Sequence, residues 1–170
     1  DTIRRRILGY EAIFQLMADL VQVNNENPKN FLIVGAGGGQ ELSTFIPSFP
    51  NAQYVAVDPS DNMLYLAKLR LAEEQLNATI DYYAEELGHV VFPQKFDVAT
   101  CHLVLHFLQT IEQKKSLIEA IAQNVAPGGM AFFSSINAEL DTANTEKMME
   151  AWGIAMLRNG VTEKQWLAFK

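Results

Sequence analysis

Three glycines and an aspartate have the residue types and the spacing to bind a nucleoside. Gly35, Gly37 and Gly39 follow the apolar run FLIV, and Asp58 follows the next apolar run, QYVAV. Glycine has no Cβ, so a ligand can approach the backbone of such a loop closely. A carboxylate at the end of the following strand can accept hydrogen bonds from both ribose hydroxyls of an adenosine. Together these residues indicate a ligand that contains adenosine.

The glycine spacing distinguishes two classes of such ligands. A dinucleotide loop has the pattern G-x-G-x-x-G, and its third glycine would fall at position 40 or 42, depending on the frame. Those positions hold Gln40 and Leu42. The three glycines follow the pattern G-x-G-x-G instead. The loop therefore disfavours an NAD-dependent oxidoreductase and indicates a smaller nucleoside.

Few other side chains could take part in chemistry. His106 is the candidate general base, because histidine titrates near neutral pH. No cluster of histidine, cysteine and acidic residues has the spacing of a metal site, so no metal is expected. The lone Cys101 cannot form a disulfide within the chain, and its apolar surroundings favour a buried, unreactive thiol.

Composition limits the possible partners. The chain has 170 residues, of which 49% are hydrophobic and 19% charged, and this predicts one domain with a sizeable core. A formal net charge of −7 lacks the broad positive surface that nucleic-acid binding needs. No apolar run reaches the roughly 18 residues of a membrane span, and no secretory leader is recognisable. We therefore expect a cytoplasmic protein that acts on a small molecule, without nucleic-acid or membrane partners.

The elements that must position these residues alternate along the chain. Strands are expected at residues 31–34, 53–57, 78–83, 96–104 and 130–136, and helices at 38–46, from 60 onwards and at 111–125. Alternation of this kind predicts βαβ crossovers, a parallel sheet and a ligand at the carboxyl ends of the strands. The expected fold is a Rossmann-like, doubly wound α/β sheet with helices on both faces.

Helical periodicity marks both flanks of this core. Apolar residues at steps of three and four predict an amphipathic N-terminal helix within residues 1–24. Residues 144–169 are expected to form two helices that separate near Asn159-Gly160. Pro47 is expected to end the helix at 38–46, and APGG at 126–129 is expected to stop a helix and form a turn.

Four motifs, in this order, resemble those of class I S-adenosylmethionine (SAM) methyltransferases. They are the glycine loop, VDPSDNML at 57–64, FDVATCHLVLHFL at 96–108 and NVAPGGMAFFSS at 124–135. The resemblance implies a SAM-binding core over residues 31–136 within a single domain, residues 1–170. The family sheet has seven strands and five are found here. We therefore expect the last strands to be missing and the helical C-terminal segment, residues 137–170, to be truncated.

The resemblance also implies which residues bind SAM. The expected cofactor contacts are Tyr10, Gly35, Ala36, Gly37, Gly39, Asp58, Pro59, Ala84, Glu85 and His102. Gly35, Ala36 and Gly37 would approach the methionine moiety, Asp58 would bind the ribose, and Ala84 with Glu85 would flank the adenine. A second register of the adenine segment, Tyr83 with Ala84, stays open. Ile33 stands where the family usually has an acidic residue.

The segment IRRRILGYEAI at 3–13 is similar to a helix that precedes the glycine loop in a bacterial group including carboxy-SAM synthases. This similarity implies that Tyr10 lies beside the methionine moiety and that Arg4 or Arg5 faces an anion. The expected function is SAM-dependent methyl transfer to a small molecule by in-line displacement. Carboxy-SAM synthesis and a non-catalytic interaction protein are the alternatives.

Without the last strands of the family sheet, strand 130–136 would be an exposed apolar edge, and such edges tend to pair with other strands. We therefore expect the missing strands, the C-terminal helices or a second copy in a homodimer to cover it.

Overall fold

The computed structural model describes residues 2–136 and 142–169, which fall into two compact units. The larger unit is Leu16–Ile136, and the smaller unit holds the described parts of Asp1–Gln15 and Asn137–Lys170. Residues 137–141 and 170 of the predicted C-terminal segment lie outside the described residues. The larger unit ends at Ile136, the end of the predicted SAM-binding core, whereas the assignment of the whole chain to a single domain stays a prediction.

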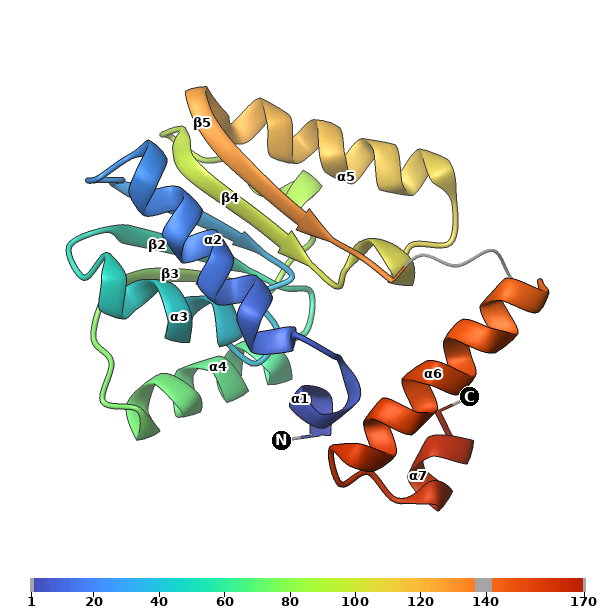
Figure 1. Ribbon diagram of the computed structural model, residues 1–170. Helices are drawn as coiled ribbons and strands as arrows, with labels where there is room; N and C mark the ends of the chain where they lie inside the picture. Colours follow the sequence, from blue (N-terminus) through green and yellow to red (C-terminus); the bar gives the residue numbers. More distant parts are fainter. Residues whose placement is uncertain (1, 137–141, 170) are drawn as a thin grey trace. The chain divides into compact units, whose positions relative to one another are not determined.

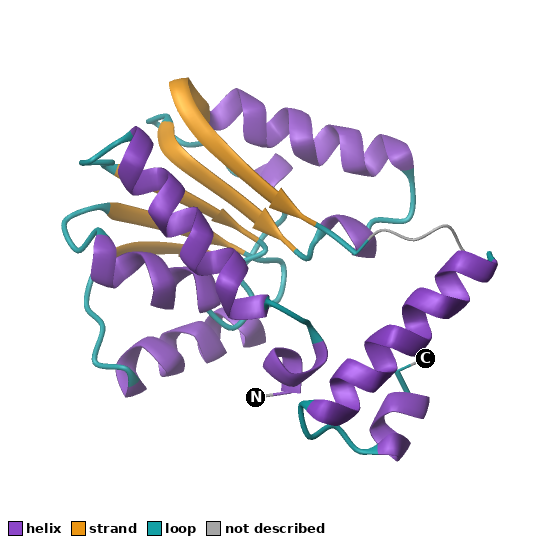
Figure 2. Ribbon diagram, viewed as in Figure 1, coloured by secondary structure: helices purple, strands orange, loops and turns teal. Residues whose placement is uncertain are grey.

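A parallel sheet of five strands forms the centre of the larger unit (Figures 1 and 2). The strands are β1 (Asn30–Val34), β2 (Gln53–Val57), β3 (Thr79–Tyr83), β4 (Phe96–His102) and β5 (Val125–Ser134). Their order is β3-β2-β1-β4-β5, and every neighbouring pair is parallel. The chain therefore reverses its direction of growth between β1 and β4, and a sheet of this kind binds ligands at the carboxyl ends of its strands there.

Helices cover both faces of the sheet, as the doubly wound fold predicts. Figure 1 shows α2 (Tyr10–Asn24) and α3 (Gln40–Ser48) on one side and α5 (Ile111–Asn124) on the other. The helix α4 (Asp61–Glu73) packs beside α3, and two short 3₁₀ helices, η1 (Leu87–His89) and η2 (Leu105–Phe107), flank β4. The predicted fold class is thus confirmed.

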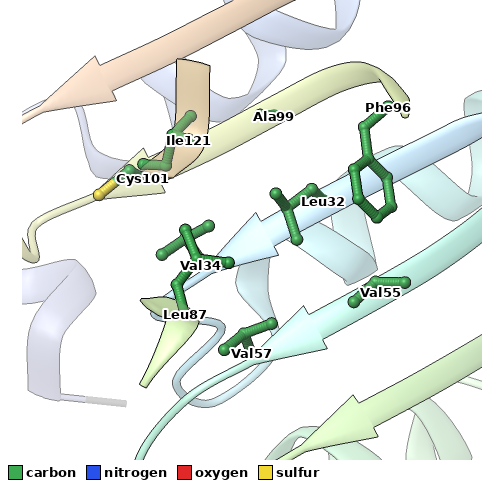
Figure 3. Packing of buried hydrophobic residues seen from close by; sticks show 9 residues of the cluster. All are labelled: Leu32, Val34, Val55, Val57, Leu87, Phe96, Ala99, Cys101 and Ile121. Carbon is green, nitrogen blue, oxygen red and sulfur yellow. The ribbon is translucent and has the colours of Figure 1, made fainter. Parts of the chain in front are cut away.

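The face of the sheet beneath α5 is apolar. Its buried cluster consists of Leu32, Val34, Val55, Val57, Leu87, Phe96, Ala99, Cys101 and Ile121 (Figure 3). Alternate strand residues point to the same face, so β1 supplies Leu32 and Val34 while β4 supplies Ala99 and Cys101. Burial raises the pKa of the Cys101 thiol to about 12, with a smaller effect of Glu41. The thiol is therefore protonated and unreactive at neutral pH, as expected from the sequence.

Aromatic residues dominate the opposite face, under α3. The Phe31 ring stacks on Tyr54 at a centroid distance of 4.9 Å and packs against Phe45 and Phe49 at 5.1 and 5.4 Å. The buried Tyr54 hydroxyl donates a hydrogen bond of 2.9 Å to the Phe49 carbonyl. This packing fixes α3, and with it the loop that precedes α3, against β1 and β2.

Three local predictions from the sequence are wrong. The N-terminal helix is two helices, α1 (Thr2–Arg6) and α2, because the chain turns at Gly9 with φ of +70°. Pro47 lies inside the last turn of α3, where it removes one hydrogen bond without stopping the helix. The APGG segment ends α5 as expected, but it lies at the start of β5, where the pairing with β4 is irregular.

The smaller unit brings the two ends of the chain together. Its helices α6 (Ala143–Arg158) and α7 (Glu163–Leu167) separate near Asn159-Gly160, which confirms the predicted break. The indole N–H of Trp152 donates to the Arg6 carbonyl, and the Arg6 guanidinium lies 5.7 Å from the centre of the Phe169 ring. No helix within the described ranges is both long and apolar enough to cross a membrane.

Candidate nucleoside-binding site

The glycine loop is held against the carboxyl end of β2 by backbone hydrogen bonds. The N–H groups of Gly35 and Ala36 both donate to the Val57 carbonyl, at 2.8 and 3.1 Å. Within the loop, the Gly39 N–H donates to the Ala36 carbonyl at 2.9 Å. The loop is therefore a fixed turn between β1 and α3, located at the edge of the sheet where ligands of this fold bind.

Asp58 connects this loop to the end of β2. One carboxylate oxygen accepts a hydrogen bond of 2.9 Å from the Gly37 N–H, and the other accepts one of 2.9 Å from the Ser60 N–H. The side chain is buried. Each oxygen has a second lone pair, so the carboxylate can still accept hydrogen bonds from a ligand. The structure thus brings together the two features, the glycine loop and Asp58, from which the sequence analysis inferred an adenosine.

Two of the three glycines are required by their neighbours in the chain itself. A Cβ on Gly35 would lie 2.2 Å from Cγ2 of Val104, in the segment after β4. A Cβ on Gly39 would lie 2.9 Å from the Ala67 Cβ and 3.0 Å from its Cα, on α4. Around Gly37 the nearest atom would be the flexible end of Met63, at 3.5 Å. Gly37 therefore has the space and the aspartate contact that a ligand-binding position needs.

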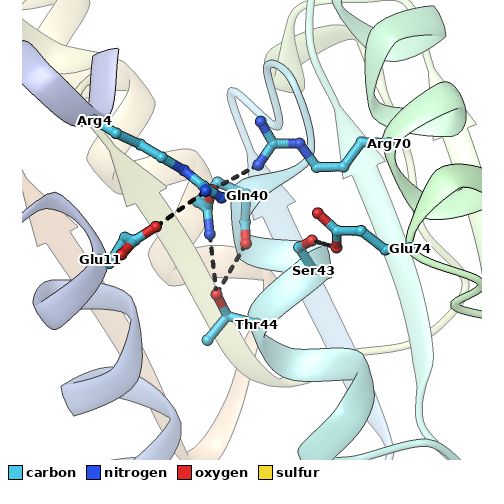
Figure 4. A network of polar contacts seen from close by, with 7 residues as sticks. All are labelled: Arg4, Glu11, Gln40, Ser43, Thr44, Arg70 and Glu74. Atoms are coloured by element: carbon cyan, nitrogen blue, oxygen red, sulfur yellow. Dashed lines mark hydrogen bonds and ion pairs between the residues drawn. The ribbon is translucent and has the colours of Figure 1, made fainter. Parts of the chain in front are cut away.

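Polar contacts fix the first turn of α3 (Figure 4). A guanidinium nitrogen of Arg70, on α4, donates to the Gln40 side-chain oxygen at 2.6 Å, and the Thr44 hydroxyl donates to the Gln40 carbonyl at 3.0 Å. The Ser43 hydroxyl donates to the carboxylate of Glu74. Gln40, which occupies a position where a dinucleotide loop would have glycine, therefore joins α3 to α4.

Glu41 is a candidate functional residue that sequence reasoning missed. It is the second residue of α3, its exposed fraction is 4%, and its Oε1 atom has no hydrogen-bond partner in the described part of the chain. Burial raises the pKa of its carboxyl group to about 8, and the charge of Asp58 contributes to this rise. The spacing of four residues to the buried Phe45 could have placed Glu41 on the inner face of the helix.

The end of β4 carries a buried histidine next to a strained residue. The His102 Nδ1 atom and the Ser134 hydroxyl are 2.8 Å apart, and burial lowers the pKa of His102 to about 4. His102 is therefore neutral at physiological pH. Leu103 follows with φ of +55°, which is unfavourable for a residue with a side chain. This turn directs Val104 towards Gly35 and was not predicted.

The candidate base His106 lies in η2 and is half-buried. Its Nδ1 atom is buried without a hydrogen-bond partner among the described residues. Burial, and to a lesser degree the charge of Lys114, lowers the pKa of this histidine, so the neutral form prevails at pH 7. A neutral imidazole can accept a proton, and this is compatible with the predicted role, which stays a prediction.

Three further residues that were predicted to contact the cofactor, Ala84, Glu85 and Tyr10, lie outside the glycine loop. Ala84 and Glu85 are exposed directly after β3, and the β3 end is joined to Asp58 by a hydrogen bond of 3.1 Å from the Asp58 N–H to the Tyr83 carbonyl. Tyr10 belongs to the smaller unit, where its ring packs edge-on against Phe14. The described residues contain no group of three histidine, cysteine or acidic side chains that could hold a metal ion.

Comparisons with known proteins identify the family of this chain. The family model described as a methyltransferase domain matches residues 32–131. The chain is 33% identical over 109 residues to a ubiquinone biosynthesis O-methyltransferase of Azoarcus sp., covering 64% of this chain and 45% of that protein. It is 38% identical over 112 residues to the enzyme of the same name from Saccharophagus degradans, with 64% and 44% covered. The chain thus spans somewhat less than half the length of these curated relatives.

A solved structure gives the same result for the fold. It is a SAM-bound amino pentose methyltransferase from Micromonospora echinaspora that takes part in calicheamicin biosynthesis. The two chains superpose with a TM-score of 0.67 and 24% identity over 79% of this chain and 54% of the other. The family model covers more than half of the sequence, and it includes the glycine loop and Asp58. This chain therefore belongs to the class I SAM-dependent methyltransferase family.

Proposed function

We propose that this chain is the SAM-binding part of an enzyme that transfers a methyl group to a small-molecule acceptor. The observation that carries the proposal is the arrangement of Asp58, whose carboxylate is buried beside the glycine loop and bonded to the Gly37 N–H. Family membership and the names of the relatives, which are methyltransferases, support it.

Two acidic residues of the site could interact favourably with the cationic groups of SAM. SAM carries a positively charged sulfonium and an amino group, and the carboxyl edge of the sheet holds two buried acids, Asp58 and Glu41. In the proposed mode Asp58 binds the ribose hydroxyls, Gly35–Gly37 lie along the methionine moiety, and Ala84-Glu85 and Pro59 lie beside the nucleoside.

When bound, SAM supplies a methyl carbon that is already activated for displacement. The protein therefore contributes mainly proximity and orientation, which can lower a barrier by up to ~7–11 kcal/mol. His106 would remove the proton of the acceptor if the acceptor must lose one. Replacing His106 by Gln should then reduce the methyl-transfer rate by roughly 10²- to 10⁴-fold without changing SAM affinity. An unchanged rate would leave His106 with a structural role only.

Carboxy-SAM synthesis and a non-catalytic role are the two alternatives to methyl transfer. Mass spectrometry of the small molecule that co-purifies with the protein distinguishes among the three. Methyltransferase function predicts SAM or S-adenosylhomocysteine in the mass spectrum of the released nucleosides. A species heavier than SAM by one carbon dioxide would support carboxy-SAM synthesis and contradict methyl transfer. The absence of any binding to SAM or its product would favour a non-catalytic protein. The cytoplasmic location, the homodimer and the lack of nucleic-acid partners are further parts of this proposal.

A further inference from the structure

The Glu41 side chain is a buried acid whose purpose the fold does not explain. It lies in the first turn of α3, directly after the glycine loop, and Oε1 has no partner within the described residues. The carboxyl group has a hydrogen bond to the backbone of Glu41 itself. A buried oxygen without a partner destabilises a protein by roughly 1–3 kcal/mol, and by more when the group is charged. Its apolar neighbours on α3, Leu42 and Phe45, are buried as well.

The geometry of α3 and two neighbouring groups indicate where the Glu41 carboxyl group lies. Side chains of a helix lean towards its N-terminus, so that of Glu41 leans back towards the glycine loop. Its charge interacts with Asp58 at the end of β2 and with Cys101 near the end of β4. These effects place the Glu41 carboxyl group near the reversal point of the sheet, where the ligand is expected.

A second buried polar group without a partner lies at the same edge. The Thr100 hydroxyl on β4 is fully buried and makes no hydrogen bond within the described residues. Thr100 pairs in register with Ile33 of β1. Ile33 alternates with Leu32 and Val34, so it and Thr100 face the α3 side of the sheet rather than the α5 side. The α3 side of the carboxyl edge therefore contains two unsatisfied polar groups.

We propose that the Glu41 carboxylate binds the ammonium group of the methionine moiety of SAM. This inference rests on the proposed function, because it assumes that the nucleoside at Asp58 is SAM or its product. The ammonium group is a cation with three N–H donors, so it would supply a countercharge for the carboxylate and a hydrogen bond for its Oε1 atom. No side chain of β1 competes for this role near the loop, since Ile33 and Val34 are apolar.

Binding of a cation at Glu41 should release a proton from its carboxyl group. Without a ligand, the carboxyl group is mostly protonated at pH 7, because burial raises its pKa to about 8. An ammonium ion stabilises the ionised form, so binding at pH 7 should release close to one proton. The affinity should then increase as the pH rises from 6 to 8 and level off only about one pH unit higher, where the free carboxyl group is mostly ionised.

Other titratable groups near Glu41 must be separated from this effect. They are Asp58 at the end of β2 and Cys101 and His102 on β4. Arg70 and Glu74 of α4 also lie nearby, since Arg70 contacts Gln40 and Glu74 contacts Ser43. The pKa of Cys101 is raised to about 12 and that of His102 is lowered to about 4. Neither of these two groups changes its charge between pH 6 and 8.

The direct test is calorimetric titration with two ligands that differ by one group. S-adenosylhomocysteine carries the ammonium group, and its deaminated analogue, S-adenosyl-4-thiobutyrate, does not. Glu41→Gln should weaken binding of S-adenosylhomocysteine by roughly 10- to 100-fold, the size of a charged hydrogen bond. The same variant should bind the analogue within about twofold of the wild type. Glu74→Gln, which removes an exposed acid bonded to Ser43, is the matched control and should change neither affinity.

The wild-type protein provides a second readout that does not depend on the variant folding. Titrations in buffers of different ionisation enthalpy count released protons, and S-adenosylhomocysteine should release nearly one more proton at pH 7 than the deaminated analogue. Equal proton release, or equal loss of both ligands in Glu41→Gln, would overturn the role of Glu41. Failure of the wild type to bind either ligand would instead contradict the proposed function, so the two failures are distinguishable.

Discussion

Asp58 and Asp97 each accept two backbone hydrogen bonds, but they lie at opposite edges of the same sheet. At the amino edge, one oxygen of Asp97 accepts from the N–H groups of Lys29 and Asn30, at 2.7 and 3.0 Å. At the carboxyl edge, Asp58 accepts from Gly37 and Ser60. Similar bonding thus fixes both ends of β1. Among residues 2–136 and 142–169, the sheet has buried polar atoms without a hydrogen-bond partner at its carboxyl edge, at Glu41 and Thr100, and not at its amino edge. This difference distinguishes a binding edge from a structural one.

The largest expected effect is on ligand affinity. Asp58→Ala should weaken S-adenosylhomocysteine binding by roughly 10²- to 10⁴-fold, because two charge-assisted hydrogen bonds to the ribose are lost. Asp97→Ala should leave the affinity within about twofold of the wild type, although it costs a similar 1–3 kcal/mol of stability. Calorimetric titration measures the affinities, and urea denaturation measures the stabilities. Equal losses of affinity in the two variants would show that the edges do not differ in function.

The next effect concerns the stability of the unliganded protein. The pKa of Glu41 is raised to about 8 from 4.5, so the folded state binds a proton more tightly than the unfolded state. Stability should therefore fall as the pH rises from about 5 to 8. Glu41→Gln should remove this slope and stabilise the protein at pH 8 by roughly 2–4 kcal/mol.

Thermal and urea unfolding between pH 5 and pH 9 provide the measurement for Glu41. The control is Glu74→Gln, since Glu74 is exposed and bonded to Ser43. This control should keep the wild-type pH dependence. A Glu41→Gln protein that is less stable than the wild type at pH 8 would mean that the carboxylate has a partner in the fold.

The smallest effect compares two glycines with nearly the same backbone conformation. Gly39 at the carboxyl edge has φ of +78°, and Gly128, at the start of β5, has φ of +80°. Alanine at Gly128 would meet no atom within 4 Å, so it should cost only the left-handed strain of about 1 kcal/mol. Alanine at Gly39 also approaches Ala67 of α4 and should cost roughly 1–2 kcal/mol more. Equal destabilisation of the Gly39→Ala and Gly128→Ala variants in urea unfolding would show that α4 shifts away from the added methyl group at little cost.

The strands could be predicted from the sequence because each is a short apolar run between turn residues. FLIV, QYVAV and FDVATC correspond to β1, β2 and β4 within two residues at either end. The glycine loop and Asp58 could also be predicted to meet, because parallel strands bring their carboxyl ends to one edge. These features depend on local patterns and on one topological rule.

Features that depend on non-local packing could not be predicted. The spacing from Glu41 to Phe45 indicates only the inner face of α3, and a glutamate in the first turn of a helix is usually exposed. Its full burial depends on how α3 packs against β1 and β2. The inclusion of APGG in β5 depends on pairing with β4, across a bulge near Phe96. The turn at Leu103 arises where the chain leaves β4, and no local signal in the sequence indicates a positive φ for leucine.

Calorimetric titration of the wild-type protein with S-adenosylhomocysteine measures whether the carboxyl edge of the sheet binds SAM or its product. We expect one site with a dissociation constant in the micromolar range and no heat with NADH under the same conditions. Failure to bind S-adenosylhomocysteine while NADH binds would contradict the assignment of the glycine loop and of Asp58 to this nucleoside.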